Sequence, residues 1–140
     1  MSRWPCLALL ALPALLACAG SHTRTLWHDT KLPSGKVVKV TSFNLVWGLE
    51  HDARTPADDC LAMEYVSALP GADGKAREAE AQEVFELARV ASEQFDFRTA
   101  TLAGFPSLER KGAYDFYVFT RGADGTWSMA RTVRKVSATD

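Results

Sequence analysis

The chain has 140 residues, of which 47% are hydrophobic and 24% charged, and its formal net charge is -1. This length suits one domain with a single hydrophobic core. A net charge near zero without a basic cluster argues against a nucleic-acid partner. Charge is nevertheless uneven, with 12 acidic and 4 basic residues between positions 50 and 96, but 4 acidic and 7 basic residues between positions 97 and 140.

The N-terminus combines a positive charge at Arg3 with an apolar run from Cys6 to Ala19 that is interrupted by Pro13. The run is shorter than the roughly 20 apolar residues that an ordinary membrane span needs. A basic start, an apolar middle and small residues at the end are typical of a secretory signal peptide. We therefore expect residues 1–17 to be removed and the rest of the chain to be secreted.

The end of this apolar run reads Leu15, Leu16, Ala17, Cys18. It resembles the lipobox of bacterial lipoproteins, and the resemblance covers residues 1–18 only. It implies that Cys18 receives a diacylglyceryl group on its thiol, that a dedicated peptidase cuts before it, and that the new N-terminus is acylated. Several acyl chains anchor firmly, since each buried CH2 contributes about 0.8 kcal/mol. Residues 18–25 would then be a lipidated N-terminus and tether, followed by one α+β domain over residues 26–140.

An ordinary cleavage site over residues 17–19 is the alternative, and it would release a soluble periplasmic protein beginning at Gly20. In Gram-negative lipoproteins an aspartate after the cysteine favours retention in the inner membrane, whereas Ala19 stands there in this chain. The resemblance therefore implies an outer-membrane lipoprotein that faces the periplasm. The implied partners are the membrane, through the lipid, and an envelope protein.

Three strands are expected before residue 70. Hydrophobic patterning predicts a short strand before a turn at residues 33–35, a long strand over about residues 36–47, and a strand that begins at Cys60. Cys60 is the single cysteine left once Cys6 and Cys18 are assigned to the signal and the lipobox. A disulfide framework is thereby excluded, and we expect Cys60 to be buried.

One amphipathic helix is predicted over residues 76–95, which are rich in helix formers and free of glycine and proline. Its apolar stripe has helical spacing and consists of Ala81, Val84, Ala88, Ala91 and Phe95, widened by Leu87. Its acidic residues are expected on the solvent side or its flanks, namely Glu78, Glu80, Glu83, Glu86 and Glu93.

Three further strands are predicted over residues 97–105, 114–121 and 126–136, the last two joined as a hairpin through residues 122–125. Aromatic residues alternate on both faces of the second, which predicts a central strand covered twice. The order strand, strand, strand, helix, strand, strand, strand favours an α+β fold, with one long helix across an antiparallel sheet of about five or six strands.

The acidic loop around residues 50–60 is a candidate site, because it carries Glu50, His51, Asp52, Asp58, Asp59 and Cys60. These residue types bind cations, yet their spacing matches no known metal motif, so we expect a solvated loop and no metal. Cys60 with His51 as base and Asp52 or Asp58 as orienting group could form a nucleophilic site. No glycine-rich turn or helix start lies near Cys60 to lower the pKa of its thiol.

Two larger sets of side chains are further candidates. The aromatic residues could enclose an apolar ligand, although the same residues could equally fill an ordinary core. Basic residues in the last strands and their loops could meet an acidic partner or phosphate groups. These basic residues are Arg110, Lys111, Arg121, Arg131, Arg134 and Lys135.

No hydrolase, zinc-protease, phosphate-loop, C-x-x-C or dinucleotide motif occurs in the chain. We therefore expect a membrane-anchored envelope lipoprotein that is not an enzyme, needs no cofactor and acts by binding a protein or another envelope component. The alternatives are a carrier of a small apolar ligand and a hydrolase that depends on Cys60 and His51.

Overall fold

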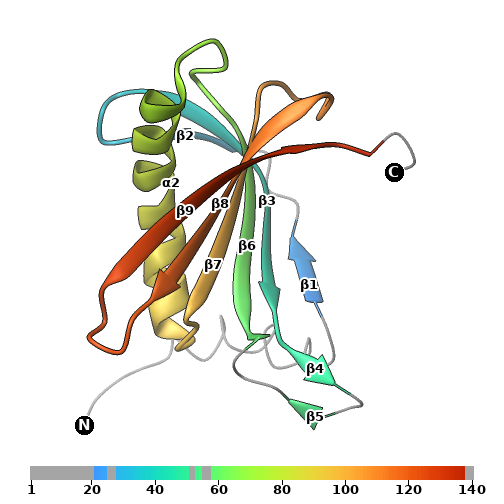
Figure 1. The fold of residues 1–140 in the computed structure, drawn as a ribbon, viewed down its shortest axis with the longest axis vertical. Helices are drawn as coiled ribbons and strands as arrows, with labels where there is room; N and C mark the ends of the chain where they lie inside the picture. The colour runs from blue at the N-terminus through green and yellow to red at the C-terminus, as the bar shows by residue number, and fades with distance from the viewer. Residues whose placement is uncertain (1–20, 25–27, 51–52, 55–57, 138–140) are drawn as a thin grey trace, which may run out of the picture.

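The computed structural model describes residues 21–24, 28–50, 53–54 and 58–137 (Figure 1). The signal peptide, the lipobox and Cys18 lie outside the described residues, as do His51 and Asp52. The predictions for residues 1–20 and for the roles of His51 and Asp52 therefore concern parts of the chain that the structure does not describe, whereas Cys60 is described.

The described chain forms short and long strands and one long helix. In chain order they are β1 (Ser21–Arg24), β2 (His28–Lys31), β3 (Val37–Val46), β4 (Leu49–Glu50), β5 (Ala53–Arg54), β6 (Cys60–Val66), α2 (Gly74–Gln94), β7 (Thr99–Phe105), β8 (Ala113–Arg121) and β9 (Trp127–Lys135).

The main sheet has the strand order β1-β3-β6-β7-β8-β9, and β2 also pairs with β3. Its pairs are antiparallel with one exception, because β6 and β7 run parallel. The expectation of an α+β fold with one long helix on a sheet is confirmed. The expectation of a purely antiparallel sheet is wrong, because α2 carries the chain from the end of β6 back to the start of β7, and such a crossover makes neighbouring strands parallel.

The order of elements also differs from the expected one. Strand β1 pairs with the second half of β3, along the same edge whose first half pairs with β2, and β4 and β5 form a separate two-stranded sheet before β6. These three elements are two to four residues long. Strands of two residues are too short for hydrophobic alternation to be visible, and the four residues of β1 contain no apolar residue that could alternate.

Helix α2 lies across one face of the sheet (Figure 1). Its N-terminus is capped by Asp73, whose carboxylate accepts a hydrogen bond from the backbone N–H of Ala76 at 2.8 Å. Ala81, Val84 and Ala88 are buried as predicted. Leu87 and Phe95 are instead 44% and 38% exposed, because Phe85 occupies the sheet-facing position beside the buried three and α2 ends before Phe95.

The core lies between α2 and the sheet, where alternate residues of β6, β7 and β8 point toward the helix. They are Leu61, Met63, Tyr65, Ala100, Leu102, Tyr117 and Phe119, and each is at most 3% exposed. The ring of Phe85 stacks on that of Phe119 with centroids 3.9 Å apart, and Trp127 meets Phe85 edge-on. These three aromatic residues thus pack against one another, as the alternative of an ordinary core expects.

The other face of β8 is only partly covered. Tyr114, Phe116 and Val118 are half-buried, and the guanidinium of Arg134 lies 3.5 Å from the centre of the Phe116 ring. The described part of the chain places no helix on this face. The prediction of a strand covered on both faces is therefore wrong. On this face the guanidinium of Arg134 from β9, rather than a second layer of structure, covers Phe116.

Candidate functional site

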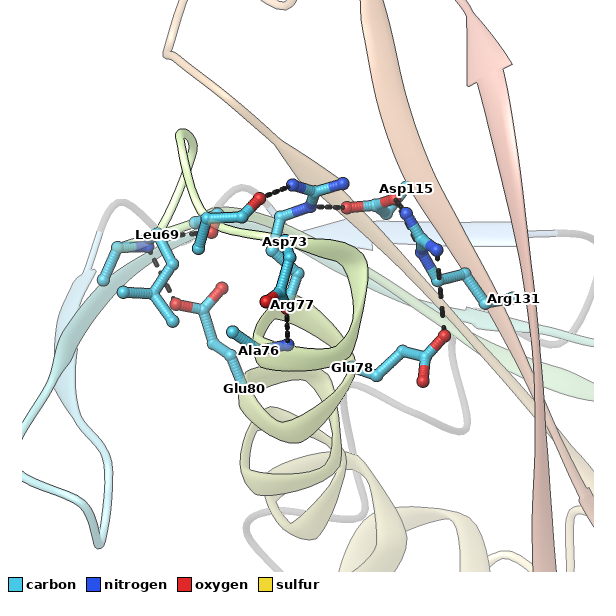
Figure 2. A network of polar contacts seen from close by, with 11 residues as sticks. Leu69, Asp73, Ala76, Arg77, Glu78, Glu80, Asp115 and Arg131 are labelled. Atoms are coloured by element: carbon cyan, nitrogen blue, oxygen red, sulfur yellow. Dashed lines mark hydrogen bonds and ion pairs between the residues drawn. The ribbon is translucent and has the colours of Figure 1, made fainter.

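A cluster of charged residues lies where the N-terminal end of α2 meets β8 and β9 (Figure 2). Nε of Arg77 donates to Oδ2 of Asp115 at 2.6 Å. Nε and Nη2 of Arg131 lie 2.9 and 2.8 Å from Oδ1 of the same carboxylate. Both oxygens of Asp115, whose side chain is 7% exposed, are thus held by arginines that come from different elements.

Backbone geometry explains why these side chains meet. Asp115 lies opposite Val133 in the β8–β9 ladder, so Arg131 is its diagonal neighbour on the face that α2 covers. Gly74 opens the helix beneath the guanidinium, and a Cβ at Gly74 would lie 2.5 Å from Nη1 of Arg131. Glycine therefore lets Arg131 lie directly against the first turn of α2.

Two further contacts complete this cluster. Nη1 of Arg77 donates to the backbone carbonyl of Ala72, and Nη1 of Arg131 lies 3.8 Å from Oε1 of Glu78. The hydrogen bond to Asp115 raises the pKa of Arg131 above its ordinary value. Each arginine is therefore tied to the protein through more than one nitrogen, which fixes the direction of its guanidinium.

A second set of polar groups is buried under this cluster. Oε2 of Glu80 accepts a hydrogen bond from the backbone N–H of Ala68 at 3.0 Å, while its Oε1 has no hydrogen-bond partner among the described residues. Burial, followed by the charge of Asp115, raises the pKa of Tyr117. Burial is also the main reason why the pKa of Tyr65 is raised. These hydroxyls remain protonated at neutral pH.

A small pocket of about 200 Å³ opens beside the charged cluster. It is lined by Ser67, Pro70, Arg77, Gly104, Pro106, Ala113, Tyr114, Asp115 and Val133. Arg77 uses Nε and Nη1 for its contacts within the described chain, which leaves Nη2 to donate to a ligand. A group bound in this pocket would lie next to a guanidinium, which favours hydrogen-bond acceptors.

Cys60 is only half-buried at the start of β6, although we expected burial. Burial first, and the neighbouring charge of Asp59 second, raise the pKa of its thiol. A nucleophilic cysteine needs the opposite shift, because the thiolate is the reactive form. Asp59 itself is buried and accepts a hydrogen bond from the backbone N–H of Gly48 at 3.0 Å.

The other parts of the acidic loop give no metal cluster in the described chain. Asp58 is exposed, and no group of three or more His, Cys, Asp or Glu residues that could hold a metal ion occurs among the described residues. The side chain of Glu50 lies outside the description, together with His51 and Asp52.

The basic residues that the sequence singled out do not form one patch. Arg110 pairs with Glu64 at 2.7 Å, Lys111 with Glu109 at 3.3 Å, and Arg121 with Asp96 at 3.7 Å. Arg131 belongs to the charged cluster, and the alternation of β9 places Arg134 on the opposite face of the sheet. Arg134 and Lys135 make no ion pair with another described residue, although the guanidinium of Arg134 lies over the Phe116 ring.

Sequence reasoning missed most of the charged cluster. Arg77 lies on the helix whose charged residues we expected to face solvent. Glu80 was predicted on the solvent side of this helix or its flanks, but it is fully buried. One signal was present in the sequence, because Asp115 has the same alternation as Tyr117 and Phe119. An acidic residue on the apolar face of a strand indicates a buried ion pair.

None of the described helices is long and apolar enough to cross a bilayer. Comparison of the chain with protein-family models, with curated proteins and with solved structures found no match.

Proposed function

We propose that this chain is a lipid-anchored protein of the bacterial envelope whose domain acts by binding an envelope protein. The sequence from Leu15 to Cys18 at the end of the apolar run carries this proposal, since it fits the requirements for acylation of Cys18. The mature protein would then remain at the outer membrane and face the periplasm.

Binding, rather than turnover, agrees with the chemistry of the described residues. The thiol of Cys60 has a raised pKa, which disfavours the thiolate. Both oxygens of Asp115 are occupied by arginines, so this carboxylate has no free position from which to take a proton. These two observations support a proposal of binding rather than turnover.

Cell fractionation of two cysteine variants tests the anchor. Cys18→Ala removes the acylation site and leaves an ordinary cleavage site, so we expect the variant in the soluble periplasmic fraction. Cys6→Ala is the matched control, because it changes a cysteine of the same apolar run and should leave the protein in the membrane fraction. Finding wild type and Cys18→Ala equally soluble would contradict the proposal.

A tethered carrier of a small ligand is the second candidate function, and the pocket beside Arg77 favours it. The pocket is smaller than the roughly 300–1,000 Å³ that is usual for ligand sites, so it suits one polar group rather than a large apolar molecule. Native mass spectrometry of protein extracted from its host should then show a bound small molecule. Tyr114→Phe, which removes one hydroxyl from the lining, should reduce its occupancy, whereas a protein that is always empty argues for the first candidate.

A further inference from the structure

Strand β9 is an edge strand of the main sheet (Figure 1). It pairs with β8 in an unbroken register from Arg121 and Trp127 to Ala113 and Lys135. No other described strand pairs with it, so its second edge carries backbone N–H and C=O groups that the sheet does not use.

The hairpin geometry identifies which backbone groups point outward. Gly122 N–H donates to the carbonyl of Thr126 at 2.7 Å, and Val136 N–H donates to the carbonyl of Gly112 at 3.1 Å. These contacts fix the alternation of hydrogen-bonded and non-hydrogen-bonded pairs between them. The residues whose N–H and C=O groups face away from β8 are therefore Trp127, Met129, Arg131, Val133 and Lys135.

This edge lacks several features that usually prevent pairing with another strand. It is nine residues long, contains no proline, and has no register shift against β8. The opposite edge of the sheet is built differently, since the two short strands β1 and β2 share it. The long regular edge of β9 is thus the place where the described sheet can be extended.

The charges on β9 indicate which kind of strand could pair with its open edge. Strand β9 contains Arg131, Arg134 and Lys135 and no acidic residue. Arg134 and Lys135 are exposed on opposite faces, and neither pairs with an acidic residue of the described chain. A second copy of β9 would offer no acidic residue to Arg134 or Lys135, since the strand contains none.

We propose that β9 binds an extended, acidic segment of a partner protein by adding it as a further antiparallel strand. Acidic side chains at the amino end of that segment would face Arg134 and Lys135, and its backbone would pair with the outward groups of Met129, Arg131 and Val133. This inference rests on the proposed function in that it names the kind of protein partner, but it does not depend on the lipid anchor.

Hydrogen exchange tests the inference on the full-length protein in detergent micelles. The probe is a nine-residue peptide of alternating threonine and valine with two glutamates at its amino end, and the control peptide has two lysines there. We expect the glutamate peptide to slow amide exchange at Met129, Arg131 and Val133 by at least about tenfold. The effect should weaken at high salt, because exposed charges are screened.

Variants at one exposed position separate backbone pairing from charge. Val133 is 60% exposed, and its N–H faces away from β8, so Val133→Pro removes an outward donor and keeps the ladder to β8. Protection by the peptide should be lost in Val133→Pro and kept in Val133→Thr. The double variant Arg134→Glu with Lys135→Glu should prefer the lysine peptide.

Three results would overturn this inference. They are equal protection by both peptides, no protection by either, and protection that appears with rising protein concentration in the absence of peptide, which would make a second copy the occupant. Membrane fractionation is a separate readout, so a soluble protein that still binds the acidic peptide would refute the anchor and leave the edge site standing.

Discussion

The carboxylate of Asp115 offers a direct test of how much the charged cluster stabilises the fold. Asp115→Asn keeps the size and one acceptor oxygen but removes the negative charge between Arg77 and Arg131. Breaking a buried ion pair typically costs about 3–5 kcal/mol. The arginine side chains are each 23% exposed, so solvent screening lowers this cost, and we expect a loss of about 2–3 kcal/mol of unfolding free energy.

Asp96→Asn is the matched control, because Asp96 also faces an arginine but is 85% exposed. Its distance to Nη1 of Arg121 is 3.7 Å, and exposed pairs of this kind contribute about 0–1 kcal/mol. Asp96 has a positive φ of 55°, a conformation that asparagine tolerates. The control should therefore stay within about 0.5 kcal/mol of wild type.

Urea unfolding followed by tryptophan fluorescence measures both variants, with the slope of the transition checked for constancy. A double-mutant cycle of Asp115→Asn with Arg131→Gln should give a coupling energy within the range of about 0.5–3 kcal/mol expected for residues in contact. If Asp115→Asn and Asp96→Asn destabilise the protein equally little, the charged cluster is no more than a surface ion pair, and our reasoning about it is wrong.

Three further predictions concern other parts of the fold. Because a hydrogen bond from the Trp127 indole lowers the pKa of Glu93 below its ordinary value of 4.5, the unfolded state binds more protons there. Stability from this contact is therefore present above about pH 4.5 and is lost as the pH falls through the lower pKa of the folded state. On acidification below pH 4.5, the unfolding free energy of Glu93→Gln should therefore decrease less steeply than that of wild type. Cys60 in the folded protein should react with iodoacetamide at pH 8 at least about tenfold more slowly than in urea, and equal rates by mass spectrometry would contradict the raised pKa of its thiol. Gly104→Ala should cost about 1–3 kcal/mol in urea unfolding, because its Cβ would lie 2.9 Å from Oη of Tyr65, and a Tyr65→Phe background should relieve part of that cost.

The sequence predicted the long elements well for a physical reason. Apolar residues recur at helical spacing in residues 81–88 and alternate in residues 61–65, and both patterns extend long enough to identify one buried face. The parallel pairing of β6 with β7 could not be derived this way, because alternation along a strand carries no information about its neighbour.

The candidate site was less accessible to sequence reasoning. Arg77, Asp115 and Arg131 are separated by 38 and 16 positions, so their meeting depends on the register of β8 with β9 and on the position of α2. Glutamates on a helix are usually solvated, and nothing in the local pattern distinguishes Glu80 from Glu83. The side chains around the N-terminal end of α2 can be assigned only once the tertiary arrangement is known.

The most direct test of the central claim is the mass of the N-terminal peptide of the native protein, purified from cell envelopes with detergent. Our account predicts a peptide that begins at Cys18 and carries a diacylglyceryl group on sulfur and an acyl chain on nitrogen. An unmodified peptide that begins at Gly20, recovered from the soluble periplasmic fraction, would contradict it.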